Sequence, residues 1–293
     1  MRAALSTPRP DPTAAGLWSS FWKDVGTDNA PHERCYVPGD GRPVVDRHWA
    51  AFADGLPHAA EVIDLACGAG IVGSTLLRRR GDLRVTGIDW ADVPTPPVAN
   101  LTIHPWVSME ALPFEDDSFD AAVSLFGIEY GDIERIAREL ERVLKAGARF
   151  SFLVHHDQSE ILREGGTRRR AIREVLSGKM RAAFLGGNAA GVDFQRQRLK
   201  AQFPGEPSMA LLLDHLGRHV LRTRAERQAV WDRLIADFGP EISLLAHLER
   251  SAKSAPGMGA WLAALLSGMR EVNISVLRRG SGEPIAWGVG GIR

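Results

Sequence analysis

The stretch EVIDLACGAGIVG, residues 61–73, decides the fold of this chain. It joins an apolar run to a turn with Gly68, Gly70 and Gly73 in the GxGxxG spacing, and a helical pattern follows at once. A strand, a glycine turn and a helix in this order are typical of dinucleotide sites, because glycines allow a tight turn and a close approach of the backbone to a pyrophosphate. The spacing alone is weak evidence, so the neighbouring residues have to identify the ligand.

Asp64 argues against a dinucleotide. It lies four residues before Gly68, in a strand whose two faces are expected to be buried and therefore apolar. An ionised carboxylate there is costly unless N–H groups or a cationic ligand satisfy it, and it would repel a pyrophosphate. S-adenosylmethionine, which carries an ammonium and a sulfonium group, removes this conflict.

Asp89 is the second acidic clue, 19 positions after Gly70 at the end of the next expected strand. This separation fits one helix and one strand, and it places a carboxylate where the two ribose hydroxyls of an adenosine can donate to it. NAD and S-adenosylmethionine share that ribose, so Asp89 does not separate them. The alternative for Asp89 is a surface acid that ends a strand.

Apolar runs and helical periods alternate from residue 61 onward, which is typical of a parallel sheet covered on both faces. We expect the third strand, LTIHPWV, at an edge of the sheet because Pro105 cannot donate to a ladder. The C-terminal segment VNISVLRRGSGEPIAWGVGGI predicts a hairpin that returns to the sheet. The remaining expected elements are strands in EVIDLA, LRVTGIDW, FDAAVSLFG and RFSFLVHH, and helices in IVGSTLLRRR and in DIERIARELERVLKAG, the latter ending at Gly147.

The alternation stops after His156, and residues 157–270 are expected to be largely helical, with glycine or proline breaks near 165, 186, 204, 239 and 256. Four regions follow. A disordered lead-in covers 1–16, N-terminal helices and a cofactor-binding core cover 17–156, a helical cap covers 157–270, and the hairpin of 271–293 completes the core sheet. The cap is the expected source of substrate selectivity, because insertions on such a core vary while the cofactor site does not.

Composition limits the partners. Lys plus Arg and Asp plus Glu number 36 each, so no global field draws the chain of 293 residues toward nucleic acid or an anionic membrane. Cys35 and Cys67 do not form an obvious disulfide framework, which fits a reducing, cytoplasmic compartment. No signal-peptide core and no apolar run of membrane-helix length is present, so no membrane partner is expected.

The ordered series of motifs resembles the class I S-adenosylmethionine-dependent methyltransferases, in their small-molecule, type 11-like branch. DLACGAG is similar to that family's first motif, VTGIDW to its second, SMEALPFEDDSFDAAVSLFGIEY to its third and fourth, and LERVLKAGARFSFLVHH to the helix and strand that close the core. The resemblance covers about residues 60–156 and the terminal hairpin. It implies an α/β fold, a Rossmann-like and mostly parallel seven-stranded sheet with a terminal β-hairpin and a helical cap insertion, and S-adenosylmethionine as the cofactor.

The resemblance also implies the cofactor contacts. Asp64, Ala66, Gly68 and Gly70 would surround the methionine part of the cofactor. Asp89 would accept from the ribose hydroxyls, and Trp90 would lie against the adenine. Ser108 and Met109 would approach the edge of the adenine, and Leu125 and Phe126 would form the floor of the site. Tyr36 would fold over the cofactor and stabilise the sulfonium, or else pack its segment onto the sheet. Three departures stand out: Ala66 replaces a more usual glycine, Ser108 stands where an acid often meets the adenine, and ADVPTPPVAN, residues 91–100, is too short for the family's second helix.

The chemistry needs little more than positioning, because the leaving group already carries the positive charge; a general base is optional. Ligands bind beyond the carboxyl ends of strands in open α/β sheets, and there we take Glu129, Tyr130 and His155 as catalytic candidates. Adjacent His156 faces the opposite side of an extended strand, so the histidine pair is no metal site, and no metal is expected. The alternative is that one histidine points into the core and the other caps a helix.

We expect methyl transfer to the oxygen, nitrogen or carbon of a small organic molecule. The basic runs TRRR, 167–170, and RQRLK, 196–200, keep an RNA acceptor open, yet few aromatic residues interleave with them as base stacking would require. The alternatives are an RNA or protein methyltransferase and a non-catalytic module that binds S-adenosylmethionine. LWSSFW, with Trp18, Phe21 and Trp22, favours the apolar face of a docking helix over a substrate cage, and a homodimer through such helices is left open.

Overall fold

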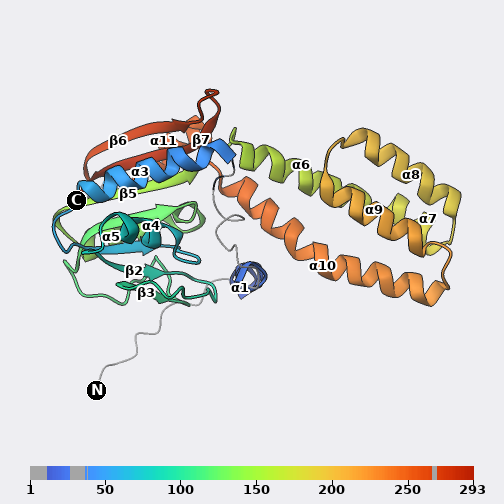
Figure 1. Cartoon of the computed structure of the whole chain (residues 1–293), viewed down its shortest axis with the longest axis horizontal. Coiled ribbons are helices and arrows are strands. Elements are labelled where there is room, and N and C mark those ends of the chain that lie inside the picture. The colour runs from blue at the N-terminus through green and yellow to red at the C-terminus, as the bar shows by residue number, and fades with distance from the viewer. Residues whose placement is uncertain (1–11, 27–36, 38, 266–268) are drawn as a thin grey trace, which may run out of the picture. The chain divides into compact units, whose positions relative to one another are not determined.

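The computed structural model describes residues 12–26, 37, 39–265 and 269–293 of the chain (Figure 1). Two compact units make up the chain. The first comprises Met1–Glu160 and Ser251–Arg293, and the second comprises Ile161–Arg250. Among the helices in the described ranges, none combines the length and the apolar character that crossing a bilayer requires.

The first unit is built on a seven-stranded sheet of order β3-β2-β1-β4-β5-β7-β6. The first five of these strands pair in parallel, whereas β7 runs antiparallel to both β5 and β6. The predicted Rossmann-like α/β fold with a terminal hairpin is therefore confirmed. The strands are β1 Glu61–Leu65, β2 Arg84–Ile88, β3 Leu101–His104, β4 Phe119–Leu125, β5 Leu144–His155, β6 Arg270–Arg278 and β7 Pro284–Ile292.

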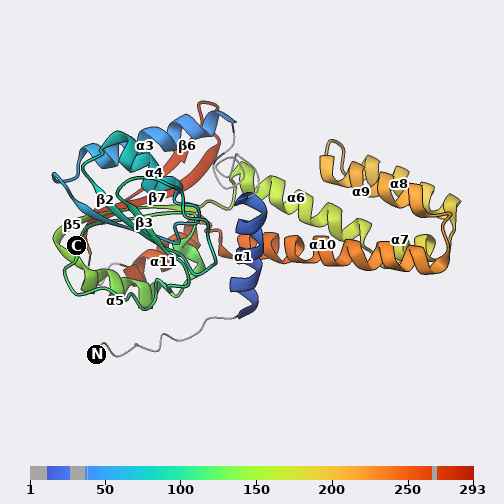
Figure 2. The ribbon, with the colours of Figure 1, turned by 60° about the horizontal axis from the view of Figure 1, so that its bottom comes forward.

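Helices cover both faces of this sheet (Figure 2). Helices α3, Arg42–Asp54, and α4, Ile71–Arg79, lie on one face, and α5, Ile133–Val143, and α11, Ala255–Leu265, lie on the other. The unit also contains α1, Pro12–Gly26, and two short 3-10 turns, η1 Gly39–Gly41 and η2 Ile128–Tyr130. The core beneath α5 and α11 joins apolar side chains of the strands and helices, including Ile63, Leu65, Ile88, Ala122, Phe150, Ile136, Leu140, Trp261 and Leu262.

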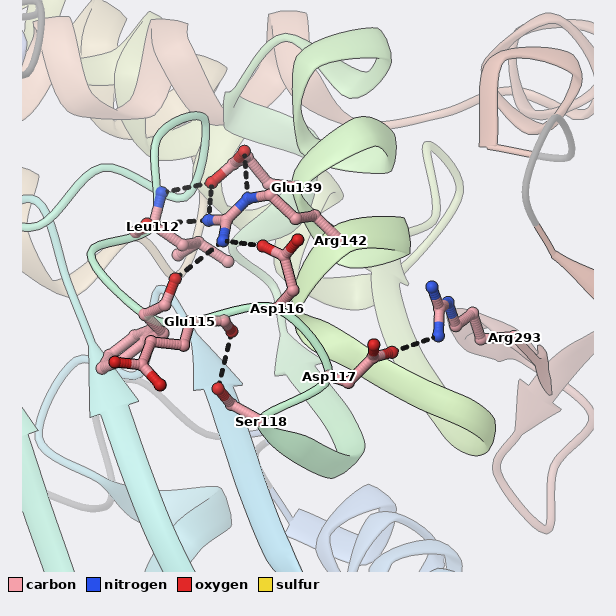
Figure 3. Close-up of polar contacts among 9 residues, drawn as sticks. Leu112, Glu115, Asp116, Asp117, Ser118, Glu139, Arg142 and Arg293 are labelled. Atoms are coloured by element: carbon pink, nitrogen blue, oxygen red, sulfur yellow. Dashed lines mark hydrogen bonds and ion pairs between the residues drawn. The ribbon is translucent and has the colours of Figure 1, made fainter.

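Arg142 of α5 holds the loop that leads into β4 (Figure 3). Its guanidinium donates to the carbonyl oxygens of Phe114, at 2.7 Å, and Leu112, at 2.9 Å. The carboxylates of Glu139 and Asp116 pair with the same guanidinium, and Glu139 also accepts the Leu112 N–H at 2.6 Å. Because a guanidinium presents several donors in a fixed plane, this one side chain fixes the path of the chain toward β4.

Strand β3 lies at an edge of the sheet, as predicted. The strand ends at His104, directly before Pro105, and it pairs with β2 alone. Residues 91–100 contain no helix, as expected from their length and three prolines.

Three boundaries differ from the prediction. Helix α5 ends at Val143 and not at Gly147, where it was expected to stop. Gly147 lies inside β5 at φ 82°, and its N–H donates to the Arg293 carbonyl oxygen. Residues 12–16, expected in a disordered lead-in, belong to α1, while 1–11 lie outside the described residues. Helix α11, expected in the cap, packs with α5 in the core of the first unit because Met258, Trp261 and Leu262 share one apolar face.

The second unit is all helical and has its own core. Its helices are α6 Glu160–Val175, α7 Gly178–Leu185, α8 Ala189–Gln202, α9 Pro207–His219 and α10 Arg224–Ser251, the first and last reaching into the adjoining residues of the first unit. Helices α6 and α10 continue through Gly165 and Pro240, where the sequence predicted breaks. The packed face of each helix, which includes Ala171, Val175 and Trp231, outweighs the local cost of these residues.

Candidate functional site

The loop between β1 and α4 is a series of left-handed turns. Ala66, Gly68 and Gly70 have φ values of 52°, 52° and 73°, and Gly70 leads into α4. The Gly70 N–H donates to the Cys67 carbonyl oxygen at 2.9 Å, which closes the turn. Ala66 adopts this conformation at a cost of about 1–2 kcal/mol, which glycine would not incur. Backbone strain is thus stored beside the end of β1.

Asp64 is buried in β1 with its carboxylate incompletely satisfied. Its side chain is part of a residue only 1% exposed, and its Oδ2 accepts a 3.3 Å hydrogen bond from the Gly73 N–H. Its Oδ1 has no partner within the part of the chain that the structure describes. Burial raises the pKa of this carboxyl to about 8, the Gly73 N–H opposes that shift, and the nearby charge of Asp89 adds to it. A positive group placed at Oδ1 would relieve the cost of ionising Asp64.

Asp89 follows β2 and holds the glycine loop against it. Oδ2 accepts from the Gly68 N–H and Oδ1 from the Ala91 N–H, both at 2.8 Å. Burial raises the pKa of Asp89 to about 6 despite these bonds. Each carboxylate oxygen keeps a second lone pair, so the predicted ribose contact is compatible with this geometry. Trp90 is half-buried, and its Nε1 finds no partner among the described residues.

The other predicted cofactor contacts are spread along the same edge of the sheet. The Ser108 hydroxyl accepts the Glu110 N–H at 3.1 Å, and Met109 packs against the core beneath α5. Leu125 ends β4 opposite Leu153 of β5. Tyr36 lies outside the described residues. These roles stay predictions.

Two of the catalytic candidates meet at the ends of β4 and β5. Glu129 Oε1 accepts from the His155 backbone N–H at 3.0 Å and contacts His155 Nδ1 at 2.7 Å, and both side chains are buried. Because an ionised carboxylate only accepts hydrogen bonds, Nδ1 carries the proton. Phe126, with φ 55°, stacks on the imidazole at 4.1 Å between ring centres.

Tyr130 and His156 are placed differently from this pair. The Tyr130 ring lies edge-on to His155 at 6.4 Å, and burial, followed by the charge of Glu129, raises the pKa of its hydroxyl well above the usual value. Tyr130 is therefore poorly suited to be a base. His156 faces the other side, where it stacks on Trp287 at 4.5 Å and Nδ1 accepts the Gln158 N–H at 3.1 Å.

Ser124 is a site residue that sequence reasoning did not single out. It is fully buried in β4, where its hydroxyl donates to the Leu65 carbonyl oxygen at 2.9 Å and accepts the Ile128 N–H at 3.2 Å. Gly127 packs next to the Ala66 methyl group. The end of β1 and the turn η2 are therefore tied together. A serine inside the apolar run AAVSLF, residues 121–126, was the available signal.

Helix α1 reaches both halves of the site. The Trp22 ring packs on Gly68 so closely that a Cβ there would overlap it, and Trp18 meets the Tyr130 ring edge-on at 5.3 Å. The Ser19 hydroxyl of the same helix accepts the Asp92 N–H at 3.0 Å. LWSSFW therefore packs on the first unit as a docking helix would, and the surface that it covers is the edge that carries the candidate site.

Residues 63–152 match the family model described as a methyltransferase domain. This part of the chain is a class I S-adenosylmethionine-dependent methyltransferase domain. The match runs from β1 to β5 and includes the glycine loop, Asp89 and Glu129. The cofactor of this domain is S-adenosylmethionine, as the motif series implied.

Curated relatives extend over the same core. The 2-phytyl-1,4-naphtoquinone methyltransferase of Nostoc punctiforme is 34% identical over 128 residues, which cover 38% of this chain and 51% of that protein. The ribosomal RNA large subunit methyltransferase G of Aeromonas hydrophila is 37% identical over 87 residues, 29% of this chain and 22% of that protein. The chain spans about half the length of the quinone-methyltransferase relatives that it matches.

A solved structure of a SAM dependent methyltransferase from Aquifex aeolicus is 13% identical to this chain. It has a TM-score of 0.44, and the superposition covers 92% of this chain and 97% of that one.

The methyltransferase domain offers a buried acceptor that an organic cation would complete. Within residues 12–26, 37, 39–265 and 269–293, no three His, Cys, Asp or Glu side chains gather as metal ligands would. The buried Oδ1 of Asp64, which lacks a partner among those residues, is instead the acceptor that an ammonium group would complete. The donor set around the glycine loop is thus consistent with S-adenosylmethionine.

Proposed function

We propose that this protein transfers a methyl group from S-adenosylmethionine to a small organic molecule. The observation that carries the proposal is the buried carboxylate of Asp64, which has one unpartnered oxygen beside a left-handed glycine loop. A dinucleotide would bring a pyrophosphate to this loop, where it would oppose the ionisation of Asp64, because two negative groups would repel each other in a region of low dielectric. A cofactor with a cationic amino acid end removes that repulsion.

The residues around the loop have separable roles in this proposal. Asp64 binds the ammonium of the cofactor, and the turn of Ala66, Gly68 and Gly70 brings backbone close to its amino acid part. Asp89 accepts hydrogen bonds from the ribose hydroxyls while it keeps the one that it accepts from the Gly68 N–H. When bound, S-adenosylmethionine supplies a methyl group on a sulfonium that leaves as a neutral thioether.

The acceptor belongs at the carboxyl ends of β4 and β5. Aromatic side chains gather there, with Phe126 stacked on His155 and Tyr130 in contact with Trp18. Such surroundings suit a planar organic ring. A relative named for a naphthoquinone substrate is similar to the same core and supports a small aromatic acceptor.

The basic runs of the helical unit give little support to an RNA acceptor. Arg168 and Arg169 of α6 pair with Glu241 and Glu249 of α10, so their charges are compensated inside the unit. Arg196 and Lys200 of the second run pair with Asp214. Counterion release needs Lys and Arg that are available to phosphates, and these four are already matched with acids.

Calorimetric titration with S-adenosylhomocysteine tests the cofactor assignment, with NADH as the competing ligand. We expect micromolar or tighter binding of S-adenosylhomocysteine, no binding of NADH, and at least tenfold weaker binding by Asp64→Asn. Asp120→Asn is the matched control, because Asp120 lies near the N-terminal end of β4, away from the strand ends that carry the site, and pairs there with Lys145 at 2.8 Å. Binding of NADH, or equal affinity in Asp64→Asn and Asp120→Asn, would contradict the assignment.

Methyl transfer from radiolabelled cofactor distinguishes a small-molecule acceptor from an RNA acceptor. The protein with radiolabelled S-adenosylmethionine should label naphthohydroquinones and other small aromatic hydroxyl compounds and leave ribosomal RNA unlabelled. Labelled RNA would favour the RNA methyltransferase alternative. Tight cofactor binding with no labelled product in either class would favour a non-catalytic module.

A further inference from the structure

We propose that His155 receives a proton from the acceptor and that Glu129 positions His155 for this step. The acceptor is then a planar compound with a weakly acidic ring hydroxyl, such as a phenol or a hydroquinone. This inference rests on the proposed function, because the methyl donor must bind beside the same strand ends. It adds to that function a proton acceptor, a residue that positions it, and the reason why the acceptor carries an acidic hydroxyl.

Glu129 holds the imidazole in one tautomer and one orientation. A single oxygen, Oε1, accepts both the backbone N–H and the Nδ1–H of His155, at 3.0 and 2.7 Å. The ring therefore cannot turn over without losing its bond to a buried carboxylate. With the proton on Nδ1, the neutral ring presents Nε2 as its acceptor atom. This is the arrangement in which a carboxylate prepares histidine as a general base.

The surroundings of His155 leave Nε2 available. It accepts no hydrogen bond from any residue in the described ranges, and the ring is held by stacking on Phe126. Among the described residues, the titratable side chains that contact the ring are those of Glu129 and Tyr130 in η2, and Lys253 reaches His155 through a backbone N–H that donates to its carbonyl oxygen. Glu129 is the ionisable side chain in hydrogen-bond contact with the ring. A proton gained at Nε2 is thus stabilised by a buried negative charge.

The pair lies next to the proposed cofactor loop. Ser124 joins the Leu65 carbonyl oxygen at the end of β1 to the Ile128 N–H in η2, which carries Glu129. Trp18 and Trp22 are four residues apart on α1, about 6 Å along a helix, and they contact Tyr130 and Gly68 respectively. An acceptor held at His155 is therefore close to a methyl donor held at the glycine loop.

The chemical step balances as follows. The ring hydroxyl of the acceptor gives its proton to Nε2 of His155. An electron pair of the resulting phenolate forms the bond to the methyl carbon, and the carbon–sulfur bond breaks with its electrons left on sulfur. The products are S-adenosylhomocysteine, a methyl ether and an imidazolium that releases its proton to solvent. If the pair comes from a ring carbon, that carbon then loses its own proton to water and the ring regains aromaticity.

A chromogenic phenol tests the proton transfer without turnover. 4-Nitrophenol is mixed with the protein saturated with S-adenosylhomocysteine in a mildly acidic buffer, and the visible absorbance of the phenolate is recorded. An imidazolium beside a bound phenolate should raise the ionised fraction of the bound probe by about tenfold or more. His155→Gln should abolish the increase and Glu129→Gln should reduce it. His156→Gln, the adjacent histidine on the opposite face, should retain it.

The position of the proton in the free enzyme tests the role of Glu129. Nitrogen NMR of the imidazole should show Nδ1–H as the tautomer of neutral His155 in the wild type, and a mixture of tautomers in Glu129→Ala. Glu129→Gln should keep the Nδ1–H tautomer, because the His155 backbone N–H orients the amide oxygen toward the ring. A merely structural role would leave the tautomer unchanged in every folded variant.

The outcomes separate this inference from the proposed function. Failure of the wild type to bind S-adenosylhomocysteine in calorimetry overturns the proposed function. Binding with no extra phenolate, or with equal phenolate in His155→Gln, overturns the inference alone. Retained S-adenosylhomocysteine binding in each variant shows that it has folded. Extra phenolate in the wild type and in His156→Gln, lost in His155→Gln, supports a proton-accepting histidine.

Discussion

Replacing Asp64 by asparagine should change stability and cofactor affinity in opposite directions. In the free protein, burial raises the pKa of Asp64 from 3.8 to about 8. Between these two pH values the folded chain holds a proton at Asp64 that the unfolded chain has released. The free energy of unfolding therefore falls as pH rises from about 4 to about 8. Asparagine carries no such proton, so Asp64→Asn is free of this dependence.

The magnitude follows from the size of that window. Each pH unit within it costs the wild type about 1.4 kcal/mol of stability relative to Asp64→Asn. Between about pH 5 and about pH 7 the difference between the two proteins should therefore shift by about 3 kcal/mol in favour of the variant. Burying the asparagine amide costs about 1–3 kcal/mol when it finds no acceptor. That cost is the same at both pH values and cancels from the shift.

Urea denaturation at the two pH values measures the shift, and calorimetry with S-adenosylhomocysteine measures affinity. Asp89 also titrates in this range, since burial raises its pKa to about 6, but both proteins contain it. Binding to the wild type should release a proton from Asp64, so the heat of binding should depend on the buffer, and Asp64→Asn should lose most of that dependence.

A stability difference that is equal at the two pH values would refute the protonated, buried Asp64. Unchanged affinity in Asp64→Asn would refute its assignment to the cofactor ammonium. A variant that is less stable at both pH values but binds normally would mean that the carboxylate serves the packing of β1 on α4 through the Gly73 N–H.

Gly68→Ala should destabilise the protein more than Gly147→Ala, because both glycines have positive φ but only a Cβ at Gly68 would meet the Trp22 ring. Thermal unfolding of the two variants measures the difference. Adding Trp22→Ala to Gly68→Ala should recover part of the lost stability. Ala66→Gly should raise the free energy of unfolding by about 1 kcal/mol, measured in urea, because it relieves a left-handed alanine. Asp89→Asn should weaken S-adenosylhomocysteine binding by more than tenfold in calorimetry, with a cost to the Gly68 turn visible as faster amide exchange there.

The sheet could be predicted because its strands are short apolar runs separated by glycine, proline or acidic residues. The edge position of β3 followed from Pro105 alone. The error at the end of α5 has a clear cause, since Val143 and Leu144 fit the apolar face of a helix as well as the start of a buried strand. Leu144 pairs with Phe119 in the structure, and that tertiary contact decides between the two.

Helix boundaries in the second unit depended on packing that no local pattern shows. Gly165 and Pro240 are expected to interrupt helices, yet α6 and α10 continue through them. The core position of α11 did leave a trace, because Met258, Trp261, Leu262 and Leu265 recur at helical spacing. Their partners in α5 lie more than a hundred residues earlier, beyond the range of any periodicity.

The two halves of the candidate site were predictable to different degrees. Asp64 stands out because a charge in a buried strand conflicts with its surroundings, and that conflict is visible in one line of sequence. The contact between Glu129 and His155 depends on the ends of β4 and β5 meeting, and on η2 turning back over them. Only the residue types and their places after the strands could be named beforehand.

Asp64 and Glu129, two of the three buried carboxylates of the site, each have one oxygen without a partner among the described residues, but they differ in what their other oxygen contacts. Glu129 has a partner within the chain, the imidazole of His155, so its charge acts through that ring. Asp64 has one backbone N–H and, among the described residues, no cation. A buried carboxylate without a cation is costly in the free protein, and a ligand that brings one regains that cost as affinity. In the roles proposed above, Asp64 therefore meets the cation of the methyl donor and Glu129 acts on the proton of the acceptor, and deprotonation and methylation of a neutral acceptor by a sulfonium donor require both functions.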